Sequence, residues 1–415
     1  MREHPFRRQV VEEMHLRRWP ELPASGIILQ IIRTVQPSDR ADELSLLRRI
    51  INDPDRPISP ADRHIAGKLP SGIQYIWERH TEGSSIAVIA EAGKSATELE
   101  KAREWIESFP GDAVRASKIY LAHNDEAAAD MMHAMPFTQG EIVSSRLIGG
   151  VRFWSDFRIH SQGYGCVLVA ANSCGSDMLS RIVQQLQELG NYRNMALLAL
   201  PLVREQWLEL DKVERQRRLF AAEVSDPATK DDALLEKVSS LSLELANLSN
   251  CISYRLDATK AYAELVNERL EGLQPEIIEG TLSLRGFTKR RFLPAVRTCA
   301  AHHDRLQRLS GRAANMTALL RARIETRIEN QNARLLKSME SRAKAQLRLQ
   351  QVVEGLSIFA LTYYSIGLLS YILHGAEEVV HLPHSGLLLA IAVPFVMLGI
   401  WLAIHRIKKR ILGQS

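Results

Sequence analysis

Cysteine and aromatic residues are both scarce in this sequence. Only four of its 415 residues are cysteines, and aromatic side chains make up 6%. Cys166, Cys174, Cys251 and Cys299 are far apart and form no CxxC pair, which excludes a disulfide framework and the spacing of a common zinc site. We therefore predict reduced thiols, as in the cytosol.

The sequence also lacks a secretory signal. Its first 20 residues are rich in arginine, but no apolar run of about seven residues follows the positive charges. We therefore expect the bulk of the protein to stay on the cytoplasmic side of a membrane.

Motifs for catalysis and for nucleotide or nucleic-acid binding are missing as well. Gly93, Lys94 and Ser95 match the end of a phosphate-binding loop, but Val88 stands where the first glycine is required. No spacing indicates a Ser/His/Asp or Cys/His arrangement, and no zinc or helix-turn-helix signature accompanies the basic residues. We therefore predict a protein that is not an enzyme, needs no cofactor and has no nucleic-acid partner.

Long apolar runs, in contrast, are present near the C-terminus. Residues 352–373 and 387–404 each approach the roughly 20 residues that a helix needs to cross a bilayer. The segment between them, 374–386, has no Lys or Arg. Basic residues flank the pair instead, namely Arg342, Lys344 and Arg348 before it and Arg406, Lys408, Lys409 and Arg410 after it. The positive-inside rule then predicts a membrane hairpin, in contact with lipid, with both chain termini in the cytoplasm.

Proline is absent between Pro294 and Pro383, and the pattern in this interval is helical. Apolar residues recur every three or four positions, so we predict one helix over 295–374, which would measure about 120 Å. A helix of that length with a narrow apolar stripe needs a partner. We expect it to pack against the preceding helices, against copies of itself in a homo-oligomer, or both.

The net charge of +5 hides two opposing blocks. Residues 285–350 carry 16 Lys and Arg against 4 Asp and Glu, a net of +12, whereas residues 1–284 carry a net of −8. We interpret the basic block as a helix that faces acidic helices of the same or a neighbouring chain, together with anionic lipid near the membrane.

The first part of the chain alternates short β-branched runs with helical patterns. Strands are predicted at 86–92, 118–124, 141–160 and 166–172, with a turn at Gly149 and Gly150, and Ser95 with Glu98 forms a capping box. From Ser176 the pattern is helical, with a break near Pro201. The predicted fold class is thus an α+β N-terminal domain, a long α-helical stalk and two transmembrane helices. The expected domains are 1–175 (cytoplasmic), 176–350 (stalk), 351–405 (hairpin) and 406–415 (basic tail).

The first apolar run has a mildly polar face. Glu354, Ser357, Thr362 and Ser365 fall within about 140° of one another on a helical wheel. They either face a pore, or bond to their own backbone and hold helices together, with Glu354 at the inner interface.

The segment between the two runs is rich in potential metal ligands. His374, Glu377, Glu378, His381 and His384 lie three, four or seven positions apart. They could attract a divalent cation at the outer mouth of a pore. The alternative is a solvated loop whose lack of positive charge serves only topology.

Several motifs together resemble one bacterial family. They are WERHTE at Trp77, SDFRIH at Ser155, NYRNMALLALPL at Asn191, YRLDATKAYAELVNERL at Tyr254, FTKRRFLPAVRTC at Phe287 and QLRLQQVVEGLSIFALTYYSIGLLSY at Gln346. On these residues the chain resembles the proteins of unknown function grouped as DUF3422. That resemblance implies a membrane-anchored bacterial protein, which would place the predicted hairpin in the bacterial inner (plasma) membrane, and it supplies no catalytic residues.

The layout alone is distantly similar to the CorA-type magnesium channels. Their Gly-Met-Asn signature is missing, because Leu373, His374, Gly375 and Ala376 stand at the corresponding place. Two hypotheses follow. The protein is either a homo-oligomeric divalent cation channel or sensor, or a non-conducting membrane anchor whose N-terminal domain binds a partner.

The charge asymmetry gives a first testable prediction about topology. A reporter that is active only outside the cytoplasm should be active when fused at Glu378 and inactive when fused after Ser415, because Lys and Arg are retained on the cytoplasmic side. The reverse pattern of activity would overturn this orientation.

Overall fold

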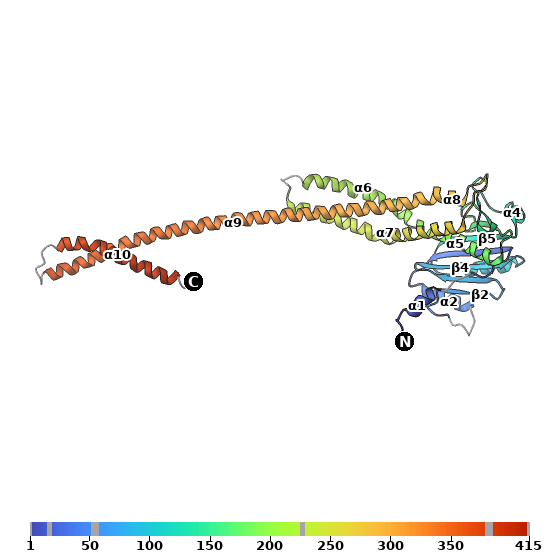
Figure 1. Cartoon of the computed structure of the whole chain (residues 1–415), viewed down its shortest axis with the longest axis horizontal. Coiled ribbons are helices and arrows are strands. Elements are labelled where there is room, and N and C mark those ends of the chain that lie inside the picture. The colour runs from blue at the N-terminus through green and yellow to red at the C-terminus, as the bar shows by residue number, and fades with distance from the viewer. Residues whose placement is uncertain are drawn as a thin grey trace. The chain divides into compact units, whose positions relative to one another are not determined.

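The computed structural model describes residues 2–14, 19–50, 58–138, 140–224, 229–377 and 385–412 (Figure 1). Contacts divide the chain into two units, Met1–Thr317 and Ala318–Ser415. The first unit contains all the strands, and the second contains the two apolar runs.

An eight-stranded sheet organises the first unit. The strand order is β2-β3-β4-β1-β5-β8-β7-β6, and only β5 and β8 pair in parallel. The predicted strands and the Gly149–Gly150 turn are confirmed, but the first three strands were missed. The strands are β1 (Gly26–Thr34), β2 (His64–Lys68), β3 (Gln74–Arg79), β4 (Gly83–Glu91), β5 (Asp112–Ala122), β6 (Val143–Arg146), β7 (Arg152–Ser155) and β8 (Gly165–Ala170).

Helices cover both faces of this sheet. One apolar cluster joins β1, β4 and β5 to α5 and α7, and another joins the opposite face to α2 and α3. Figure 1 accordingly shows α5 and α2 on opposite sides of the strands. A strand buried on both faces carries a continuous apolar run and not an alternating one, which is why GIILQIIRT at β1 gives little period-two signal.

The short helices belong to the sheet region. In α3 the predicted capping box is confirmed, because Ser95 Oγ accepts from the Glu98 backbone N–H at 3.2 Å and Glu98 accepts from the Ser95 N–H at 3.1 Å. These helices are α1 (Arg7–Glu13), α2 (Arg40–Ile50), α3 (Ala96–Glu107), α4 (Asp125–Met132) and α8 (Leu284–Phe287), with a single π turn at Thr288–Phe292.

Three long helices continue the first unit. They are α6 (Ala199–Val224), α7 (Asp231–Leu273) and the first part of α9 (Leu293–Glu377), and a buried apolar cluster joins them. The break predicted near Pro201 lies at Leu198, between α5 (Ser176–Leu197) and α6. Arg305 on α9 binds Asp211 and Glu214 on α6 at 2.7 and 2.6 Å, so basic and acidic helices do meet here.

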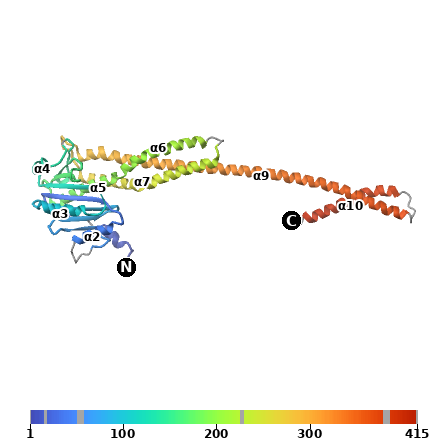
Figure 2. The same ribbon diagram turned by 180° about the vertical axis from the view of Figure 1, so that it is seen from behind.

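The second unit consists of the rest of α9 and α10 (Ser385–Leu412). Both helices are long and apolar enough to cross a membrane, with mean hydropathies of 1.6 and 1.9 over their most apolar windows. The ends of α9 and α10 lie side by side in both views (Figures 1 and 2). Every side chain of residues 325–353 is exposed.

A buried histidine in the first unit makes stability depend on pH. His302 on α9 is fully buried, 5.9 Å from the ring of Trp207, and neither ring nitrogen has a hydrogen-bond partner among the described residues. Desolvation lowers the pKa of His302 below its usual 6.5, with smaller contributions from Arg305 and His303. A base with a lowered pKa binds protons more readily when unfolded, so its contribution to stability is present above pH 6.5 and is lost as the pH falls below it.

We therefore expect the melting temperature of the first unit to fall between pH 7.5 and about 5.5, and to fall less in His302→Leu. His303→Gln removes only one of the smaller contributions and should keep most of this pH dependence. Circular dichroism of the full chain in detergent measures this. An equal pH dependence in His302→Leu would contradict the assignment.

Candidate functional site

The polar face predicted in the first apolar run lies against α10 for part of its length. The half-buried Glu354 accepts from Nζ of Lys408 at 2.6 Å. Thr362 is 6% exposed, and its hydroxyl donates to the carbonyl of Ile358 at 2.7 Å. These groups therefore have partners within their own chain.

The other two predicted pore residues differ in exposure. Ser357 is exposed and donates to the carbonyl of Val353 at 2.8 Å, whereas Ser365 is half-buried. Hydroxyls on a helix commonly bond to the carbonyl four residues before them, and that geometry requires no pore.

The predicted cation cluster is only partly described. His374 contacts the carbonyl of Ser370 through Nδ1 at 3.0 Å, and Glu377 is the last residue of α9. Glu378, His381 and His384 lie outside the described residues. Within the described ranges, no group of three His, Cys, Asp or Glu side chains could hold a metal ion.

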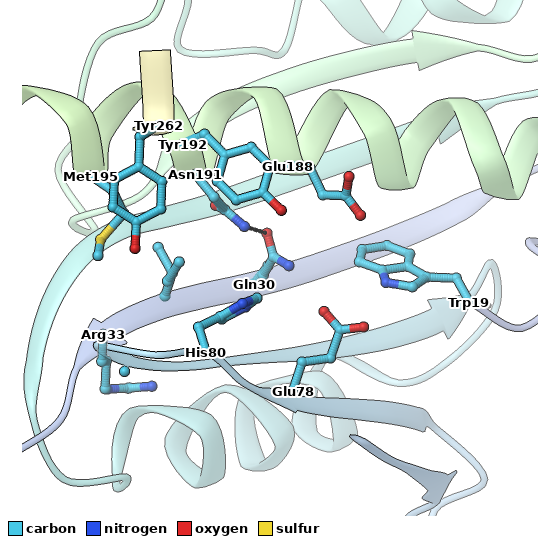
Figure 3. Close-up of a pocket in the computed structure, with 12 residues that line it drawn as sticks. Trp19, Gln30, Arg33, Glu78, His80, Glu188, Asn191, Tyr192, Met195 and Tyr262 are labelled. Carbon is cyan, nitrogen blue, oxygen red and sulfur yellow. Dashed lines mark hydrogen bonds between the residues drawn. The ribbon is translucent and has the colours of Figure 1, made fainter. Parts of the chain in front are cut away.

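A cavity that sequence reasoning missed lies in the first unit, between the sheet and α5. Its volume is about 40 Å³, room for a few water molecules. In Figure 3, Gln30 rises from β1 toward Asn191 and Tyr192 on α5, and Trp19 lies at one end. Glu78, His80, Glu188 and Tyr262 also line it.

A hydrogen-bonded network extends from this cavity along the sheet. Asn191 Nδ2 donates to Gln30 Oε1 at 3.2 Å, and Arg115 Nη1 donates to Asn191 Oδ1 at 2.9 Å and to Gln187 Oε1 at 2.7 Å. Gln187 also bonds to Ser117 at 2.9 Å. None of these hydrogen bonds joins two charged groups. The side chains of Gln30, Ser117 and Gln187 are each no more than 3% exposed.

The position of this network follows from strand geometry. Gln30 pairs with Ser117, and Ile32 with Arg115, across the β1–β5 ladder, so these side chains share one face. Gln187 and Asn191 are four residues apart on α5 and therefore also share a face. The polar groups consequently meet where α5 crosses the sheet.

Two tyrosines and one ion pair lie at the cavity. The rings of Tyr192 and Tyr262 stack with centroids 5.9 Å apart, and burial raises the pKa of Tyr262 to about 12. Glu188 binds Arg269 at 2.5 Å. Because both phenols stay protonated at neutral pH and Glu188 is paired, these three side chains supply hydrogen bonds and not a free charge.

The segments that carry the family resemblance surround this place. Glu78 and His80 come from WERHTE, Asn191 and Tyr192 from NYRNMALLALPL, and Tyr262 from YRLDATKAYAELVNERL. A sequence signal did exist, because Gln30 interrupts an apolar strand. Its hydrogen-bond partner Asn191, however, lies 161 positions away, and only the fold brings the two together.

Gly190 gives a test of the network. A Cβ at this position would lie 2.7 Å from Cζ and 2.8 Å from Nε of Arg115, so alanine must displace the guanidinium. We expect Gly190→Ala to destabilise the protein by about 1–3 kcal/mol through the lost charged hydrogen bonds, although alanine itself favours a helix.

The matched control is Gly311→Ala on α9, where nothing lies within 4 Å of the added Cβ. This control should be neutral or stabilising by up to about 1 kcal/mol. Denaturant titration of the full chain in detergent measures both variants. If Gly190→Ala is as stable as Gly311→Ala, Arg115 is not fixed as described.

Comparison with known proteins places the chain in a family without a known activity. The model of the family described as protein of unknown function (DUF3422) matches residues 2–411. Neither a curated protein nor a solved structure matches the chain, so the predicted likeness to CorA-type channels is not supported. The resemblance noted from the motifs is confirmed over nearly the whole sequence, and the chain belongs to the DUF3422 family.

Proposed function

We propose that the protein is a non-conducting membrane anchor, whose C-terminal hairpin tethers the sheet-containing unit so that this unit can bind a ligand on the cytoplasmic side. The ion pair between Glu354 and Lys408 carries this proposal. It joins the cytoplasmic end of the first apolar run to the end of the second.

A conducting path needs polar groups that are free to replace the hydration shell of an ion. Glu354, the only carboxylate in residues 352–373, is instead neutralised by Lys408 of the same chain. Thr362 is buried and donates to its own backbone. A carboxylate whose charge is neutralised in this way fits a position at the cytoplasmic membrane interface better than a position in the lining of a pore.

The outward surface of the hairpin supports membrane attachment. Leu356, Phe359 and Ile372 on α9 are 64–71% exposed, as is Phe395 on α10 at 71%. Apolar side chains this exposed are costly in water and favourable in lipid.

A second copy of the chain supplies the missing partner of α9. Ile328, Leu335, Met339 and Leu347 are 51–66% exposed within residues 325–353, where every side chain is exposed. An isolated helix is marginal in water. Ile328, Leu335 and Met339 are seven and four positions apart, a spacing typical of helices that pair with themselves, so we propose a homo-oligomer formed along this segment.

Flux measurements separate the anchor from a channel. Liposomes carrying the full chain should take up magnesium, cobalt, nickel, zinc and manganese no faster than empty liposomes, because no free polar stripe is offered to the ions. The protein should nevertheless float with the vesicles and resist alkaline extraction.

The double variant Thr362→Leu with Ser365→Leu is the control. It should behave like the unmodified protein in both assays. Cation flux that this variant abolishes would refute the anchor and favour the channel, with Glu377, Glu378, His381 and His384 at its mouth. The mass of the unmodified full chain in detergent tests self-association, and a monomeric mass would refute the homo-oligomer.

A further inference from the structure

Two half-buried arginines among the described residues have no carboxylate partner: one lies on α5, and the guanidinium of the other meets α5 at Gly190. They are Arg115 on β5 and Arg193 on α5. Within the described ranges, Arg115 bonds only to the neutral amides of Gln187 and Asn191, and the guanidinium of Arg193 has no hydrogen-bond acceptor. Two partly desolvated positive charges without a counter-charge are costly unless an anion joins them.

Two carboxylates close in sequence to Arg193 and to Phe157 have other partners. Glu188 on α5 binds Arg269 at 2.5 Å. Asp156, next to Phe157, accepts from the backbone N–H groups of Thr138 and Arg158 at 3.0 and 3.1 Å. Neither is available to neutralise the pair.

Arg193 is held in place by aromatic rings. Its guanidinium carbon lies 4.3 Å from the ring centroid of Phe157 and 5.5 Å from that of Phe287, and the two rings stack at 4.3 Å. Stacking on a ring face fixes the plane of a guanidinium and leaves its in-plane N–H groups free to donate. The site is thus ordered without using the donors that an oxyanion needs.

The backbone around the pair is also unusual. Phe157 has a φ of +53°, a left-handed conformation that side chains with a Cβ rarely adopt, and Ser155 Oγ holds it by accepting from its N–H at 3.1 Å. Gly190 has no side chain where the Arg115 guanidinium approaches. Gly190 thus leaves room for the Arg115 guanidinium, and the left-handed backbone at Phe157 places the ring on which Arg193 stacks.

We propose that Arg115 and Arg193 form a binding site for a phosphate-bearing small molecule, with the amides of Gln187 and Asn191 holding Arg115 in position. A phosphate monoester carries close to two negative charges at neutral pH, so one group balances both arginines, whereas a carboxylate balances only one. This proposal specifies the class of ligand that the sheet-containing unit binds, and it therefore rests on the proposed function.

The ionisation state of the pair agrees with this site. Burial, and to a smaller extent the charge of Arg193, lower the pKa of Arg115 to about 9, and burial lowers the pKa of Arg193 to about 10. Both groups still carry a positive charge at pH 7, and a bound anion would raise both pKa values.

The test is calorimetric titration of the full chain in detergent at low salt with inorganic phosphate and with glycerol phosphate, and with acetate for comparison. We expect saturable phosphate binding with a Kd of about 1 mM or tighter and much weaker acetate binding. If glycerol phosphate binds more strongly than inorganic phosphate, the ligand is an organic phosphate ester. If the two bind equally, the ligand is free phosphate.

Arg115→Met and Arg193→Met should each weaken phosphate binding by about tenfold or more. Arg193→Lys keeps the charge and the fold and should lose less. Arg181→Met, an exposed arginine on the same helix, should bind like the unmodified protein. Circular dichroism checks that each variant is folded.

Two outcomes would overturn the proposal: no phosphate binding by the unmodified protein, or binding unchanged in folded Arg115→Met and Arg193→Met. Either would make the arginines a purely structural pair. Because this assay does not measure flux, a negative result would refute the phosphate site and not the membrane anchor. Conversely, cation flux in liposomes would refute the anchor and not the phosphate site.

Discussion

The contact between the Arg115 guanidinium and α5 constrains much of the first unit. A half-buried cation with only amide partners fixes three things at once: the register of Gln187 and Asn191 on α5, the absence of a side chain at Gly190, and the face of β5 that meets the helix. Apolar packing alone tolerates small slides of a helix on a sheet. A directional network does not, because a slide would leave buried polar atoms unpaired.

Neighbouring contacts of α5 connect the sheet to the long helices. Arg193 follows Gly190 by three residues, and its stacking on Phe287 reaches α8, which leads into α9. Thr259 on α7 adds a second link, since its hydroxyl donates to the carbonyl of Ala196 at the end of α5 at 2.7 Å. Binding of an anion between Arg115 and Arg193 would therefore act on the seam where the sheet, α5 and α8 meet, and not on an isolated surface.

Part of the basic block has a local explanation. Arg305 is neutralised by Asp211 and Glu214, and this arrangement lowers the pKa of Glu214 to about 2. Further along α9 the side chains of residues 325–353 are exposed. A helix with exposed Leu335 and Met339 and several arginines is suited to pairing with a copy of itself or to lying near anionic lipid.

The sequence by itself determined the elements whose signals are local. The capping box at Ser95, the Gly149–Gly150 turn, the uninterrupted helix after Pro294 and the two apolar runs each depend on neighbours within a few positions. Strand β1 was missed because a strand buried on both faces has no alternation to detect. The cavity and the Arg115–Arg193 pair were decided only by the tertiary structure. Their residues come from strands and helices more than 70 positions apart, and whether an arginine has a carboxylate partner depends on which side chains the fold brings beside it.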